Sequence, residues 1–89
     1  MTSRPHVLVI GTGSIGERHT RCFLATGRVD VSICEVDDAV REAVSSRCDV
    51  RGSHADLATA LDVQPDIAVV STPAHLHVAM ATQLLEAGV

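Results

Sequence analysis

The sequence is almost without aromatic residues, since Phe23 stands alone and Trp and Tyr are absent. A core must therefore be built from Val, Ala, Leu and Ile, a composition that suits a parallel sheet packed closely under helices. Lys and Asn are absent too. Without lysine, no side-chain ammonium group can act as general acid, Schiff-base former or phosphate ligand, so arginine must supply any cationic contact.

Positive charge is also scarce: the chain has seven arginines and eleven acidic residues, for a net charge of −4 with histidine neutral. This balance excludes the basic face that nucleic acid binding needs, so we expect no nucleic acid partner. Cys22, Cys34 and Cys48 are odd in number and match neither a disulfide framework nor a paired zinc motif. No membrane-length apolar run is visible, and we expect a cytoplasmic protein with free thiols, no membrane contact and no metal.

What the chain does have is a regular alternation of strand and helix patterns. Short apolar runs predict strands at 7–10 and 67–70, and alternation of apolar with polar residues predicts one at 29–34. Val50 alone supports a weak strand at 49–51. Apolar positions with helical spacing follow each of them, from Ser14, near Val40, from Leu57 and from Leu76. This order predicts an α/β fold, an incomplete doubly wound parallel sheet of about four strands with helices on both faces.

Turn and capping residues mark the ends of these segments. Gly27 and Gly88 stand where left-handed helix ends belong, and either Asp37 or Asp38 can cap the second helix. Ser53 and Asp56 have the spacing of a capping box for the third helix.

A glycine-rich hexapeptide follows the first strand directly: Gly11-Thr12-Gly13-Ser14-Ile15-Gly16. The three glycines of such a motif permit a tight turn, close approach of a pyrophosphate and close packing of the helix, in that order. The free N–H groups near Ser14 and Ile15 would hold phosphate oxygens. Because the motif lies between a strand and a helix, it predicts dinucleotide binding.

Glu35 ends the second strand, nineteen residues after the last glycine of the motif. An acid at this place accepts hydrogen bonds from the adenosine ribose and repels a 2′-phosphate. Asp37 and Asp38 add negative charge beside it. We therefore expect NAD as cofactor, with NADP disfavoured.

A second polar segment, residues 71–77, follows the last strand and should face the glycine loop across the carboxyl edge of the sheet. A plainer interpretation is open at this point, in which Thr72 caps a helix and the histidines are solvated. His75 and His77 diverge around a helix start, which argues against a shared metal. His19 lies one turn into the first helix and has only a modest claim on the site.

Three motifs in this order, at residues 11–19, 31–37 and 69–77, resemble the amino-terminal domain of the Gfo/Idh/MocA oxidoreductases, from about His6 to Val89. The resemblance implies a nicotinamide-dependent dehydrogenase or reductase for sugars, inositols or similar polyols. It matches Gly11, Gly13 and Gly16 to the phosphate loop, Glu35 to the ribose ligand, and Thr72, Pro73 and His77 to the segment near the nicotinamide.

Departures from the family pattern limit what this chain should do. The family continues into a strand with Glu-Lys-Pro, whose lysine is catalytic, and into a mostly β substrate domain. We therefore interpret 1–89 as a partial cofactor-binding domain without the carboxyl-terminal catalytic domain, and expect it to bind cofactor without turnover. We also expect self-association through the apolar edge strand 67–70.

Two other functions are compatible with parts of the sequence. A non-catalytic NAD-sensing regulatory module explains Glu35 and the small size, but leaves the Thr72–His77 segment without a role. An S-adenosylmethionine-dependent methyltransferase fragment also has a glycine loop and an acid, but Gly16 and Thr72-Pro73 count against it.

Overall fold

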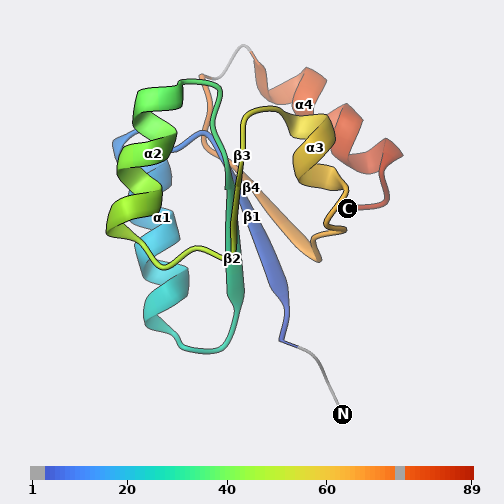
Figure 1. Cartoon of the computed structure of the whole chain (residues 1–89). Helices are drawn as coiled ribbons and strands as arrows, with labels where there is room; N and C mark the ends of the chain where they lie inside the picture. Colours follow the sequence, from blue (N-terminus) through green and yellow to red (C-terminus); the bar gives the residue numbers. More distant parts are fainter. Residues whose placement is uncertain (1–3, 74–75) are drawn as a thin grey trace.

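A computed structural model describes residues 4–73 and 76–89. Four parallel strands form one sheet in the order β3-β2-β1-β4, as the sequence predicts (Figure 1). Strands and helices alternate along the chain, with these bounds: β1 His6–Ile10, α1 Ser14–Ala25, β2 Asp30–Cys34, α2 Asp38–Arg47, β3 Gly52–His54, α3 Leu57–Leu61, β4 Ile67–Val70 and α4 His77–Glu86.

The central strand β1 is buried along its whole length, because it has a neighbour on each side and helices above and below. Val7 pairs with Val31 of β2 and with Ile67 of β4. In this arrangement β3 and β4 are the two edges of the sheet. The fully apolar pattern of residues 7–10 therefore reflects burial on both faces.

Helices α1 and α2 cover one face of the sheet, and α3 and α4 cover the other (Figure 1). Side chains of alternate positions in β1 and β2 enter opposite cores, since a strand has a side-chain period of two. Val7, Val9, Val31 and Ile33 pack under α1 and α2 together with Val44. The opposite core, under α3 and α4, consists of Leu8, Ile10, Cys34, Ala60 and Leu84. Both cores consist mainly of aliphatic side chains, as the composition predicts.

Capping follows the predictions in three places. Gly27 and Gly88 both have positive φ, at 66° and 84°. Of the two candidate acids, Asp37 is the cap and Asp38 is the first residue of α2, because Asp37 Oδ1 accepts a hydrogen bond from Val40 N at 3.0 Å. Its carboxylate satisfies one of the free N–H groups of the first helical turn.

Two predictions around the third strand are wrong. The strand is Gly52–His54 and not 49–51, because pairing with β2, through Arg51 N to Val31 O and then Ser32 with Gly52, places the ladder after Val50. Ser53 therefore lies within β3 and caps nothing. Asp56 itself is the N-cap of α3, accepting at Oδ1 from Thr59 N at 2.8 Å.

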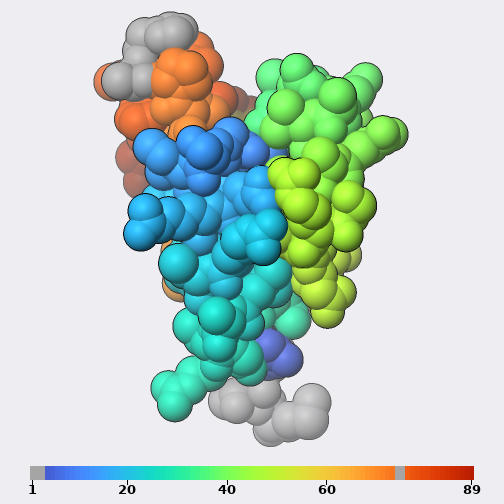
Figure 2. Space-filling view, turned by 90° about the vertical axis from the view of Figure 1, so that its left-hand side faces the viewer, coloured from blue at the N-terminus to red at the C-terminus, as the bar shows by residue number. Residues whose placement is uncertain are grey.

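The helices on one face also contact one another. Figure 2 shows α1 and α2 side by side over that face of the sheet. An ion pair joins them, with Glu17 Oε1 2.7 Å from Arg47 Nη2. Within the described ranges, no helix has the length and hydropathy needed to cross a membrane.

Candidate functional site

Two of the loop glycines are required by the fold itself. Gly11 has φ +84°, and its N–H donates to Cys34 O at 2.8 Å, so the chain turns sharply out of β1. A Cβ on Gly11 would lie 2.9 Å from Thr72 Cγ2. A Cβ on Gly16 would lie 1.8 Å from the carbonyl oxygen of Gly11. Any larger residue at either position would therefore force the backbone apart.

Gly13 differs from them, because a Cβ there would meet no atom within 4 Å and its φ is −63°. It is the N-cap residue of α1 and offers no side chain to the helix N-terminus. Among the described residues, nothing accepts a hydrogen bond from the N–H groups of Ser14 or Ile15. The open space and the two free donors fit a phosphate at the positive end of the helix.

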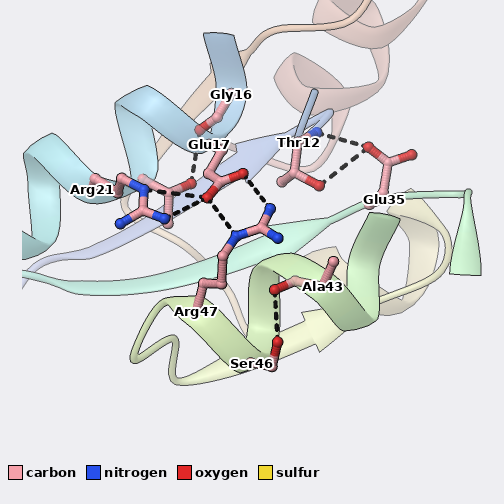
Figure 3. A network of polar contacts seen from close by, with 9 residues as sticks. Thr12, Gly16, Glu17, Arg21, Glu35, Ala43, Ser46 and Arg47 are labelled. Atoms are coloured by element: carbon pink, nitrogen blue, oxygen red, sulfur yellow. Dashed lines mark hydrogen bonds and ion pairs between the residues drawn. The ribbon is translucent and has the colours of Figure 1, made fainter. Parts of the chain in front are cut away.

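Glu35 is held in place by the glycine loop (Figure 3). Its Oε1 accepts hydrogen bonds from Thr12 N at 2.7 Å and from Thr12 Oγ1 at 3.2 Å. Its Oε2 accepts from Asp37 N at 3.0 Å. Thr12 is 1% exposed. The hydroxyl of Thr12 thus orients the carboxylate of Glu35, and the two loops at the ends of β1 and β2 are joined.

A cleft of about 420 Å³ opens at the carboxyl ends of β1, β2 and β4. It is lined by residues of the loops that follow these strands, Gly11, Gly13, Glu35, Ser71, Thr72 and Pro73. Apolar side chains form the rest of its wall, among them Val36, Leu57, Leu76 and Met80. The position is the one at which open α/β sheets bind their ligands.

Cys34 also lines this cleft, but it is buried, and burial raises the pKa of its thiol to about 11. The thiol therefore stays protonated at neutral pH and is a poor nucleophile. Cys34 therefore contributes to the cleft wall by packing and not by chemical reactivity.

The segment after β4 touches both the glycine loop and α4. Thr72 Oγ1 donates to Met80 Sδ at 3.3 Å, and the carbonyl oxygen of Thr72 lies 2.6 Å from His77 Nε2. Thr72 does not cap α4, because the N-cap residue is Leu76 and no side chain caps it. Pro73 lines the cleft, whereas His77 is exposed and is not among the residues that line it.

The other histidines are spread over the molecule. His19 is exposed on α1 and does not line the cleft. His6 is buried in β1, with its Nε2 2.6 Å from Ser32 Oγ. His75 lies outside the described residues. Within the described part of the chain, no three His, Cys, Asp or Glu side chains are grouped as metal ligands.

Two features of the site have little or no signal in the amino-acid sequence. Leu57 and Met80 form part of the apolar wall, but the helical spacing of these residues predicts only that they pack in the core. Arg41 extends from α2 back to the end of β2, where its Nη1 donates to Glu35 O at 2.8 Å. The three-residue spacing from Asp38, its ion-pair partner, is the one signal that could have revealed it.

The fold and the cleft together define a Rossmann-type domain built to hold a dinucleotide. Residues 6–89 match the model of the oxidoreductase family GFO_IDH_MocA, described as an NAD-binding Rossmann fold. The chain belongs to this family, as its motifs suggest. This assignment decides against the methyltransferase alternative.

Two solved structures are similar to the chain. One is the WlbA dehydrogenase from Chromobacterium violaceum in complex with NADH and UDP-GlcNAcA, with a TM-score of 0.84 and 28% identity. The other is GenD2 from gentamicin A biosynthesis in complex with NAD, with a TM-score of 0.88 and 32% identity. Each likeness covers 99% of this chain and 26% of the other, so the chain spans about a quarter of their length. No curated protein matches the chain.

Proposed function

We propose that this chain is the cofactor-binding part of an NAD-dependent dehydrogenase or reductase acting on a sugar, inositol or similar polyol. The observation that carries the proposal is the cleft between the glycine loop and Thr72-Pro73, with the Glu35 carboxylate at its margin. The complexes of WlbA with NADH and UDP-GlcNAcA, and of GenD2 with NAD, support both the cofactor and the substrate class.

The glycine loop would hold the pyrophosphate. The N–H groups of Ser14 and Ile15 are free, and Gly13 leaves room for phosphate oxygens to approach the backbone. The helix dipole of α1 favours negative charge at this point. These features do without a lysine, which the chain lacks.

Glu35 would accept hydrogen bonds from the ribose hydroxyls. A carboxylate offers about four acceptor positions, and three are used by Thr12 and Asp37. Capacity therefore remains at Oε2, the oxygen with one partner. In this proposal Thr12 acts through Glu35, since its own side chain is buried.

Thr72 and Pro73 would border the nicotinamide, with His77 holding the Thr72 carbonyl in place. When bound, the nicotinamide accepts or supplies a hydride. The apolar side chains of Leu76 and Met80 would keep water from this end of the cleft. The proton-transfer group and the substrate pocket would be supplied outside residues 1–89, so we expect cofactor binding without turnover by this chain alone.

The test is a calorimetric titration of the purified chain with NADH and with NADPH, repeated with Gly13→Ala. We expect saturable NADH binding and weaker NADPH binding. Gly13→Ala should fold normally, because the added methyl group meets nothing, yet bind NADH at least about tenfold more weakly by blocking the pyrophosphate. Ser46→Ala on α2, away from the cleft, is the control. A folded chain that does not bind NADH would overturn the proposal.

We further propose self-association through the edge strand β4 in a reducing, cytoplasmic setting. Ile67 is 46% exposed at this edge, and an apolar groove lined by Ile67, Leu84 and Leu85 runs beside it. Unpaired N–H and C=O groups on such an edge favour strand pairing between chains. Sedimentation equilibrium at tens of micromolar should show dimers or larger species. A monodisperse monomer would contradict this.

A further inference from the structure

Around the turn between β2 and α2, the guanidinium of Arg41 lies near three acidic residues, Glu35, Asp37 and Asp38. Arg41 lies in the second turn of α2, and its guanidinium is directed back toward the end of β2. Its Nη1 donates to the carbonyl oxygen of Glu35 at 2.8 Å, and its Nη2 pairs with Asp38 Oδ1 at 2.5 Å. The Arg41 side chain is only 18% exposed. The guanidinium is therefore held next to the residue at which the ribose should bind.

Of the three carboxylates, only Asp38 neutralises Arg41. Glu35 is occupied by Thr12 and by Asp37 N, and Asp37 caps α2 through Val40 N. Asp38 is 82% exposed. Because the acidic partner of this ion pair is in solvent, the pair is weak, and a stronger anion can compete for the guanidinium.

NADP differs from NAD by a 2′-phosphate on the same ribose, and a guanidinium fork is well suited to bind phosphate. Acid and arginine, the groups that favour opposite cofactors, thus occupy one turn of this chain. Both selectivity elements are therefore present: Glu35 can accept hydrogen bonds from the ribose, whereas Arg41 is already paired with Asp38.

We propose that Arg41 is a masked ligand for the 2′-phosphate of NADP, and that cofactor preference depends on Glu35 and on the Asp38–Arg41 pair together. Glu35 repels the phosphate, and Asp38 retains the guanidinium that would otherwise bind it. This inference rests on the proposed function and names the group that sets its cofactor selectivity.

The test is calorimetry with NADH and NADPH on the full chain in a Glu35→Ser background. Adding Arg41→Gln should weaken NADPH binding about tenfold and change NADH binding much less, because only NADPH has the 2′-phosphate. Adding Asp38→Asn instead should strengthen NADPH binding relative to NADH binding about three- to fivefold, in keeping with a weak ion pair whose acid is in solvent. Adding both should abolish that gain.

Glu42→Gln is the matched control, since Glu42 is an exposed acid on the same helix and makes no contact with Arg41. It should leave the NADPH to NADH ratio in the Glu35→Ser background unchanged. An equal gain from Glu42→Gln, or a gain that survives Arg41→Gln, would show a general charge effect and overturn the inference.

The two proposals fail differently. If the chain binds NADH but its ratio of NADPH to NADH binding does not change with Arg41→Gln, only the inference about Arg41 is overturned. A chain that is folded by circular dichroism and binds neither cofactor, before and after substitution, overturns the proposed function and this inference with it.

Discussion

Replacing Gly16 by alanine should break the junction between β1 and α1. The added Cβ would lie 1.8 Å from Gly11 O and 2.8 Å from Gly11 C. Both are backbone atoms, so relief requires α1 to move away from the loop by more than an ångström. Overpacking of this kind costs about 1–3 kcal/mol, and this contact is at the severe end. A chain of this length has a total stability of about 4–13 kcal/mol.

Urea unfolding followed by circular dichroism measures the loss. With a slope of about 1 kcal/mol per molar urea, Gly16→Ala should lower the midpoint by about 2–3 M. Gly13→Ala is the matched control, because its Cβ meets nothing within 4 Å. It should lose at most about 1 kcal/mol of stability, because alanine is a poorer N-cap residue than glycine. A Gly16→Ala chain with an unchanged midpoint would refute the close approach of α1 to Gly11.

Three further predictions concern single side chains. Hydrogen bonds from Arg47 and Arg21 lower the pKa of Glu17 to about 2. The contribution of this network to stability is therefore complete above about pH 4.5 and is lost as the pH falls toward 2. The urea midpoint should decrease over this pH range, and it should decrease less in Arg47→Gln. Burial lowers the pKa of His6 below 6.5, so the unfolded chain binds its proton more readily. The melting temperature should fall as the pH drops below 6.5, and less so in His6→Gln. Thr12→Val should weaken NADH binding about fivefold and narrow the gap to NADPH, with Thr12→Ser restoring both, whereas equal losses for both cofactors would contradict the orienting role.

The sequence alone determines most of the architecture, because its signals are local. The runs at 7–10 and 67–70 are apolar at every position, and both form strands: β1 is buried along its whole length, whereas β4 lies at an edge of the sheet and is only partly buried. Gly11 and Gly16 stand between strand and helix, and the contacts that a Cβ would make explain why no other residue serves there. Glu35 is placed at the site by counting from the last glycine.

The position of β3 and the contacts of Thr12 and Arg41 depend on the tertiary structure and not on local sequence patterns. β3 has no apolar side chain, so its position comes from hydrogen bonds to β2, and the prediction of 49–51 fails for this reason. Thr12 occupies a variable position of a common motif, yet its hydroxyl points to Glu35. Arg41 reads as an ordinary helix residue until α2 is packed and its guanidinium reaches the end of β2. Such contacts join residues far apart or on different elements, and their geometry exists only once the chain has folded.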